Sequence, residues 1–187
     1  MALRVDEAMQ QRRPLHVRHR WVPYDQIAAS LKQAVIVSED GAFFQHDGVD
    51  YAELRMALEQ NWSRPWRLRG ASTITQQLAK NLYLTPSRTP TRKLSELLIT
   101  RRLEAELPKR RILELYLNLI EWGDGIWGAE AAAQAYFGVP AAALSAPQSA
   151  LLAAAIINPR VFSPSRPSPF MLRRQQTILA RMAGRAF

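Results

Sequence analysis

Helical periodicity runs through almost the whole of this chain, and it is the feature that most limits the possible folds. Apolar residues recur every three or four positions, and no stretch alternates apolar and polar residues long enough to indicate a strand. The predicted helices span residues 25–40, 50–62, 72–84, 92–107, 109–122, 126–137, 146–158 and 170 to about 185. We therefore expect an all-α fold, in one compact domain that could have two lobes.

Residues that favour helix ends support several of these boundaries. Asp25 and Asp50 precede apolar-periodic runs and are predicted N-caps, as is Ser145. Thr73 stands three residues before Gln76, which is the spacing of a capping box. These side chains predict where four helices begin.

Charge and cysteine content narrow the functional classes. The formal net charge is +9, and no cysteine is present, which excludes disulfides, a thiolate nucleophile and a cysteine zinc site. An excess of positive charge favours an anionic partner, such as nucleic acid, an acidic lipid surface or a diphosphate substrate. No apolar stretch approaches the roughly 20 residues that cross a bilayer.

The stretch VSEDGAFFQH, residues 37–46, combines side chains that neither a core nor a solvated turn would select. Glu39 and Asp40 end an apolar run, and Phe43, Phe44 and His46 follow. This mixture indicates the wall of a cleft. His46 could be a base or a ligand, although a lone histidine is more often structural.

In residues 70–81, GASTITQQLAKN, small and hydroxyl-bearing residues precede the N-terminus of a predicted helix. Free amides at such a terminus favour anions. Thr73, Gln77 and Lys80 fall on one helical face, with Asn81 beside them. The face suits a sugar-phosphate ligand, and a solvated surface is the alternative that periodicity alone slightly favours.

Two further stretches are ambiguous by themselves. In RKLSE, Arg92 and Glu96 could form an ordinary surface pair, or Arg92 and Lys93 could hold a diphosphate with Glu96 as a second carboxylate. In residues 109–123, Tyr116 belongs to an apolar stripe. Its position favours a core role over one at the edge of a cleft.

In combination these stretches resemble the glycosyltransferase domain of peptidoglycan polymerases, the transglycosylase domain of penicillin-binding proteins, and above all its monofunctional members. Five motifs occur in order over about residues 35–160. They are Glu39, Asp40, Phe43, His46 and Gly48; Gly70 to Asn81; Arg92, Lys93 and Glu96; Lys109 to Asn118; and Ala132 to Gly138.

The resemblance implies a lysozyme-like all-α fold with a large globular lobe and a smaller membrane-facing lobe, as one domain over residues 1–187. It implies polymerisation of lipid II into β-1,4-linked glycan with inversion and release of undecaprenyl diphosphate. The outer, periplasmic face of the bacterial inner membrane is the expected location. The N-terminal transmembrane anchor that the resemblance also implies is absent from the chain as given.

Site residues follow from the same resemblance. Glu39 is expected to be the general base, and Glu96 a second catalytic carboxylate that orients cations or helps to bind the donor. The expected substrate-binding residues are Asp40, Phe43, His46, Thr73, Gln77, Lys80, Asn81, Arg92, Lys93 and Tyr116. No protein-bound metal is expected, and Mg²⁺ or Mn²⁺ at the diphosphate stays open as a cofactor.

The expected partners are lipid II, the growing glycan strand and an anionic membrane surface, with other cell-wall synthesis proteins left open. The stretch around Trp62 and Trp66 would suit a membrane interface as well as a solvated loop. A lysozyme-like muramidase is the main alternative, because paired carboxylates also serve hydrolysis. A nucleic-acid-binding module is a weaker one, since no docking motif is evident.

Overall fold

The computed structural model describes residues 16–63, 70–84 and 89–184 of the chain. Most of these residues are helical, as the periodicity predicts. The chain divides into two compact units, Met1–Val35 with Leu117–Phe187 and Ile36–Tyr116. The boundaries fall inside two helices, α2 and α6, and each unit is described separately below.

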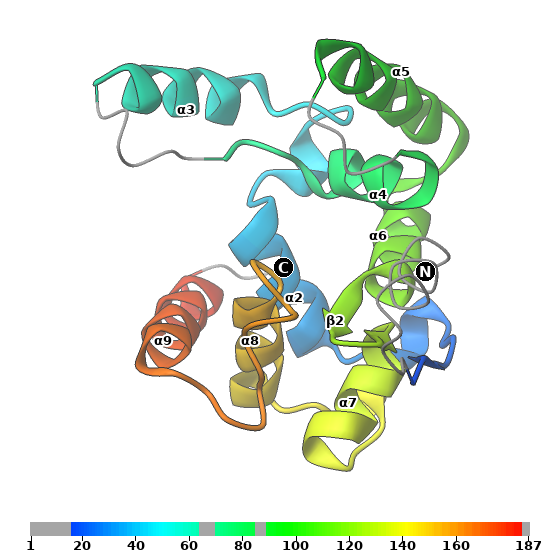
Figure 1. Ribbon diagram of the computed structural model, residues 1–187, viewed down its shortest axis with the longest axis vertical. Coiled ribbons are helices and arrows are strands. Elements are labelled where there is room, and N and C mark those ends of the chain that lie inside the picture. Colours follow the sequence, from blue (N-terminus) through cyan, green and yellow to red (C-terminus); the bar gives the residue numbers. More distant parts are fainter. Residues whose placement is uncertain (1–15, 64–69, 85–88, 185–187) are drawn as a thin grey trace. The chain divides into compact units, whose positions relative to one another are not determined.

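The helices of the described residues, labelled in Figure 1, agree with the predicted ones to within a few residues at most ends. They are α2 (Ala29–Glu39), α3 (Tyr51–Ser63), α4 (Ile74–Tyr83), α5 (Pro90–Glu106), α6 (Lys109–Leu119), α7 (Ala129–Phe137), α8 (Ala146–Ala155) and α9 (Pro169–Ala183). Single 3-10 turns occur at η1 (Tyr24–Gln26), η2 (Phe43–Gln45) and η3 (Ala141–Ala143).

In the first unit, α8 and α9 lie side by side (Figure 1). Leu151 and Ala155 of α8 pack with Met171 of α9 in a buried cluster. Ser145 caps α8 as predicted, because its hydroxyl accepts a hydrogen bond from the amide of Gln148 and completes a capping box. The apolar run of this helix therefore forms the centre of the unit.

A small sheet in the first unit departs from the sequence prediction. Its strands are β1 (Arg18–His19), β2 (Glu121–Gly123) and β3 (Ile126–Trp127), in the order β1-β3-β2. β1 runs parallel to β3, and β2 runs antiparallel to it. Strands of two or three residues are too short to show an alternating pattern, so the helices predicted at 109–122 and 126–137 included most of β2 and all of β3, and β1 was not predicted.

Two predicted helix starts are also corrected. Asp25 is not an N-cap: it lies inside the turn η1, and α2 begins only at Ala29. The helix predicted from Ile126 begins at Ala129, because Gly128 has a φ of +82° that a helix does not accept. Both errors arise where apolar residues in a turn continued the helical spacing by chance.

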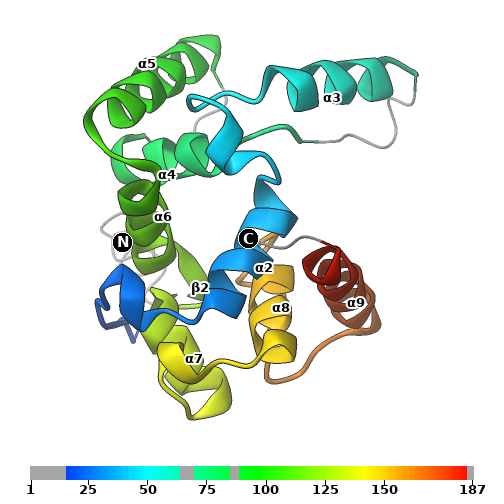
Figure 2. The ribbon, with the colours of Figure 1, turned by 180° about the vertical axis from the view of Figure 1, so that it is seen from behind.

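In the second unit, α4 and α5 pack side by side (Figure 2). Thr73 caps α4 through a complete capping box with Gln76, as predicted. Asp50 accepts a hydrogen bond from the amide of Glu53 at 2.8 Å, which confirms it as the cap of α3. Local side chains thus fix where both helices begin.

Helix α3 exposes most of its apolar side chains. Ala57 is its buried residue, whereas Leu58 is 62% exposed and Trp62 is 91% exposed. The periodicity of apolar residues predicts this helix correctly, but most of those residues are exposed rather than buried. Among the residues that the structure describes, no helix is both long enough and apolar enough to span a membrane.

Candidate active site

Glu39 is the last residue of α2, and its half-buried side chain is held by a neighbouring helix. The side-chain amide of Gln77, on α4, donates a hydrogen bond from Nε2 to Glu39 Oε2 over 3.0 Å. An N–H donor of this kind fixes the orientation of the carboxylate that accepts from it. The bond joins two residues that are 38 positions apart in the sequence.

The Gln77 amide has two further partners. Its oxygen Oε1 accepts a hydrogen bond of 2.8 Å from the hydroxyl of Tyr116, on α6. Its nitrogen Nε2 also approaches the backbone carbonyl of Ser72 at 3.5 Å. Three helices therefore converge on Gln77.

Tyr116 is fully buried, as its place in the apolar stripe of α6 favours. Burial raises the pKa of its hydroxyl well above the usual value of 10, and the negative charges of Glu39 and Asp40 raise it further. The hydroxyl therefore keeps its proton throughout the physiological range. A side chain without exposed surface cannot touch a ligand directly, so Tyr116 reaches the site only through Gln77.

Asp40 is buried next to Glu39 and is fully engaged by hydrogen bonds. Its Oδ2 accepts from the backbone amide of Ile74 at 2.9 Å, and its Oδ1 accepts from His46 Nε2 at 2.9 Å. The amide of Gly48 donates to His46 Nδ1 at 3.1 Å, so Nδ1 is the acceptor and Nε2 carries the proton. Asp40 and His46 therefore stabilise the backbone next to Glu39.

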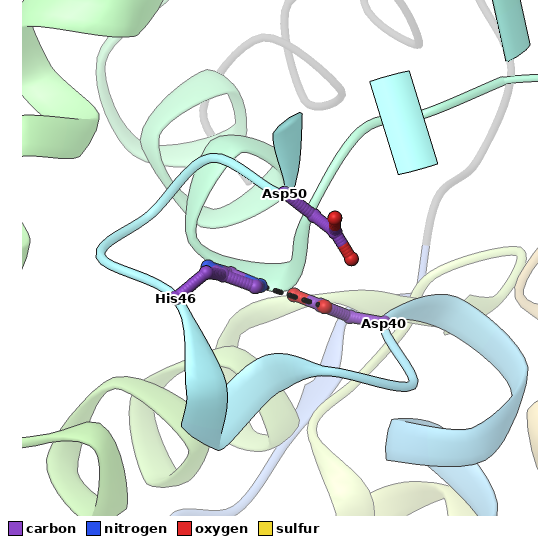
Figure 3. A group of neighbouring side chains, drawn as sticks. All are labelled: Asp40, His46 and Asp50. Carbon is purple, nitrogen blue, oxygen red and sulfur yellow. Dashed lines mark hydrogen bonds and ion pairs between the residues drawn. The ribbon is translucent and has the colours of Figure 1, made fainter. Parts of the chain in front are cut away.

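Asp40, His46 and Asp50 are the cluster of the described residues closest to a metal-binding arrangement. One oxygen or nitrogen of each lies within 4.8 Å of the others. Figure 3 shows the three side chains next to one another. The oxygens of Asp40 and both ring nitrogens of His46 are already used, and Asp50 caps α3. A cation would have to break the Asp40–His46 bond, so the geometry indicates a structural cluster.

Thr73 is buried, and its hydroxyl is used in two ways. It donates a hydrogen bond of 2.7 Å to the carbonyl of Gly48, and it accepts from the amide of Gln76 at 3.2 Å. These bonds fix the N-terminus of α4 against the loop that carries His46. Periodicity placed Thr73, Gln77 and Lys80 on one helical face. In the structure Thr73 is buried, Gln77 is half buried and Lys80 is exposed, so the three side chains are not equally accessible to a ligand.

Lys80 and Asn81 are exposed on α4. Lys80 follows Gln77 by one helical turn, so the two share a face. No hydrogen bond or ion pair joins either side chain to another described residue. The ammonium group of Lys80 is thus presented to solvent one turn beyond the residue that holds Glu39.

A second charged cluster lies on α5. The Arg92 guanidinium donates to Glu96 Oε2 at 2.7 Å, and the Lys93 ammonium pairs with Oε1 of the same carboxylate. Glu96 is 3% exposed, and Arg92 is largely buried. The expected alternative of an ordinary surface pair does not fit this burial, because Glu96 holds two cations in fixed positions.

Phe43 is fully buried, whereas Phe44 is half exposed, and their rings meet edge to face at 5.0 Å. The Lys109 ammonium lies 4.6 Å from the centre of the Phe43 ring and 2.8 Å from Glu104 Oε1. Thr75 donates to the same oxygen of Glu104 at 2.5 Å. No local spacing marked Glu104 in the sequence, because Thr75 lies 29 positions away and Lys109, although only five positions on, lies beyond Pro108 in the next helix.

The predicted membrane-interface stretch is described only in part. Trp62, the penultimate residue of α3, is exposed, and Trp66 lies outside the residues that the structure describes. The described residues that were expected at the site include a carboxylate held by Gln77, an exposed ammonium on α4 and, on α5, a buried carboxylate that pairs with two cations. This set can accept a proton and stabilise negative charge.

The sequence is similar to known proteins along most of its length. Residues 6–183 match the sequence model of a family described as "Transglycosylase". The chain is 50% identical over 177 residues to the biosynthetic peptidoglycan transglycosylase of Nitrosomonas eutropha, covering 94% of this chain and 72% of that protein. It is 53% identical over 167 residues to the protein of that name from Rhodospirillum centenum, covering 89% of this chain and 72% of that protein.

Proposed function

The chain belongs to the transglycosylase family, and we propose that it polymerises lipid II into β-1,4-linked glycan strands, as one glycosyltransferase domain. Its activity is peptidoglycan glycosyl transfer, and the helical fold agrees with the lysozyme-like domain that its motifs imply. The observation that carries the proposal is the Gln77–Glu39 hydrogen bond, because it orients the Glu39 carboxylate from a residue of α4 that lies one helical turn before the exposed Lys80.

In the proposed reaction, the 4-hydroxyl of lipid II is the acceptor and the lipid-linked strand is the donor. Glu39 takes the hydroxyl proton while the oxygen attacks the donor's anomeric carbon and inverts its configuration. The bond to the diphosphate breaks, and the electron pair leaves with undecaprenyl diphosphate. A base must come within hydrogen-bond reach of that hydroxyl, and a side chain at a helix end that is only half buried can do so.

Cations around the leaving group would lower the barrier further, because negative charge grows on the diphosphate as the bond breaks. Lys80 and Arg92 are the proposed contacts, with Lys93 and Asn81 in support. Glu96 would hold Arg92 and Lys93 in position rather than act on the sugar, because both its oxygens already pair with them. Mg²⁺ or Mn²⁺ at the diphosphate would add further positive charge there.

We place the reaction at the outer face of the inner membrane, where the growing strand and lipid II are anchored. The net charge of +9 favours anionic headgroups, which attract basic side chains at about 1 kcal/mol each near the surface. The exposed Leu58 and Trp62 of α3 offer apolar contacts of the kind found at a membrane interface.

The direct test is to incubate the purified chain with fluorescent lipid II in detergent, with and without chelator, and to separate the products by size. We expect glycan polymer and free undecaprenyl diphosphate. Loss of product with chelator, restored by Mg²⁺ or Mn²⁺, would establish the metal. Fragments released from finished cell wall, with no polymer from lipid II, would contradict the proposal and favour the muramidase alternative.

A further inference from the structure

A buried tyrosine is connected to the proposed base through a single amide. The Tyr116 hydroxyl lies 2.8 Å from Gln77 Oε1, and Gln77 Nε2 lies 3.0 Å from Glu39 Oε2. We infer that Tyr116 is a positioning residue that holds Gln77, and through it Glu39, in the geometry required for proton removal. This inference rests on the proposed function.

The partners of Gln77 specify which way its amide points. The carboxylate of Glu39 and the carbonyl of Ser72 can only accept hydrogen bonds, and both face Nε2. A flipped amide would place its oxygen against these two acceptors. The Tyr116 hydroxyl reinforces the observed orientation because it supplies a donor to Oε1, so every polar atom of the amide is matched.

The environment keeps Tyr116 in the form that can donate. Burial and the charges of Glu39 and Asp40 raise the pKa of its hydroxyl well above 10, so the proton stays on the phenol. Tyr116 itself sits on α6 without exposed surface, where packing fixes its ring. Because the Tyr116 hydroxyl is held rigidly and donates to the Gln77 amide, it limits the motion of the Glu39 carboxylate that the same amide contacts.

Tyr116→Phe removes the hydroxyl and keeps the ring. The amide oxygen of Gln77 would then face an apolar edge, and the amide could rotate away from Glu39. Small displacements of a base reduce the rate of proton transfer far more than they reduce substrate binding. With lipid II as substrate, we expect kcat to fall about five- to tenfold and KM to stay within about twofold.

Tyr136→Phe is the matched control for loss of a tyrosine hydroxyl. Tyr136 is half buried, and its hydroxyl donates to the carbonyl of Trp122 at 3.3 Å, in the first unit of the chain. We expect its kcat and KM to match those of the wild type. A Tyr116→Phe variant with wild-type kcat, or with a loss confined to KM, would overturn the inference.

A double-mutant cycle tests whether Tyr116 acts through Gln77. Gln77→Met keeps the length of the side chain and removes the three hydrogen bonds of its amide. We expect Gln77→Met to lower kcat at least as much as Tyr116→Phe, and the double variant to lose no more than Gln77→Met alone. If the fold reductions in kcat of the two single variants multiply in the double variant, Tyr116 does not act through Gln77. A Gln77→Met variant with wild-type kcat would also contradict the inference, even if Tyr116→Phe failed to fold.

The outcomes separate this inference from the function on which it rests. A wild-type chain that makes no polymer would refute the proposed function and the inference together. A wild-type chain that makes polymer, with Tyr116→Phe equally active, would refute only the positioning role.

Discussion

The carboxylate of Asp40 accepts a hydrogen bond from the backbone amide of Ile74, 2.9 Å away. Ile74 is the first residue of α4, so its amide is among those that no helical carbonyl can satisfy. Asp40 follows directly after Glu39, whereas Gln77 lies one turn into α4. The Asp40–Ile74 hydrogen bond therefore connects the residue next to Glu39 to the first residue of α4, the helix whose Gln77 orients Glu39.

Asp40→Asn should destabilise the protein by about 1–3 kcal/mol. The carboxylate accepts from both Ile74 and His46, but an amide offers one oxygen and turns its NH₂ group toward the second donor. The free energy of unfolding in urea would measure the loss. Asp50→Asn is the matched control, because asparagine caps helices as well as aspartate does and should change stability by only a few tenths of a kcal/mol. Equal losses in the two variants would contradict the special role of Asp40.

Gly48→Ala should be more destabilising than Gly138→Ala. Both glycines have a positive φ, +88° and +66°, which costs a non-glycine residue about 1–2 kcal/mol. A Cβ on Gly48 would also lie 2.6 Å from Cγ2 of Thr100, whereas a Cβ on Gly138 has no neighbour within 4 Å among the described residues. Comparing the melting temperatures of the two variants isolates the clash.

Thr100→Ser provides the second half of this test. Serine lacks Cγ2 but keeps the hydroxyl that bonds to the carbonyl of Glu96 at 2.7 Å. Combined with Gly48→Ala, it should recover part of the lost stability. No recovery would show that contact with Cγ2 of Thr100 is not what limits position 48.

Local patterns predicted the parts of this fold that depend on neighbours in the sequence. The Thr73 capping box and the Asp50 cap are examples, since each bond spans three residues. The same patterns could not reveal the Asp40–Ile74 bond, which joins residues 34 positions apart. Nor could they show that the apolar residues of α3 are exposed, because periodicity identifies an apolar helix face but does not show whether another element packs against it.

The site residues illustrate the same limit. Motif resemblance selected Glu39, Gln77 and Tyr116 together, but their contacts depend on three helices packing in one unit. The tyrosine was expected to contact substrate, and its complete burial assigns it an indirect part instead. Substrate contacts of Lys80, Asn81, Arg92 and Lys93 stay predictions.

Glu39→Gln should fold and bind lipid II but make no glycan strand. The glutamine oxygen can still accept from Gln77 Nε2, so the local geometry is kept while the base is lost. Loss of a general base lowers rates by about 10²- to 10⁴-fold. Polymer formation and lipid II binding measured on the same sample check this, with the exposed Glu59→Gln as the control. Polymerisation at the wild-type rate would remove Glu39 from the base role.

Lys80→Ala should lower the polymerisation rate by on the order of 100-fold, because one preorganised cation would be missing from the leaving diphosphate. The exposed side chain contributes little to folding, so the unfolding free energy should change by less than about 0.5 kcal/mol. Arg102→Ala removes a cation that is also exposed, on α5, and should leave the rate unchanged. An unaltered rate in Lys80→Ala would refute the proposed contact with the diphosphate.

Tyr116 should make the stability of the protein depend on pH in the alkaline range. In the unfolded chain this hydroxyl ionises near pH 10, whereas burial and the charges of Glu39 and Asp40 raise its pKa well above that value in the folded protein. Above pH 10 the unfolded state therefore binds fewer protons than the folded state, and the free energy of unfolding falls as pH rises, by up to about 1.4 kcal/mol per pH unit. The contribution is complete below pH 10 and is lost as pH rises toward the folded-state pKa. Tyr116→Phe cannot ionise, so its stability deficit measured at pH 8 should shrink above pH 10, when urea unfolding of both proteins is followed at each pH. A deficit that stays constant up to pH 11 would show that the hydroxyl titrates alike in both states.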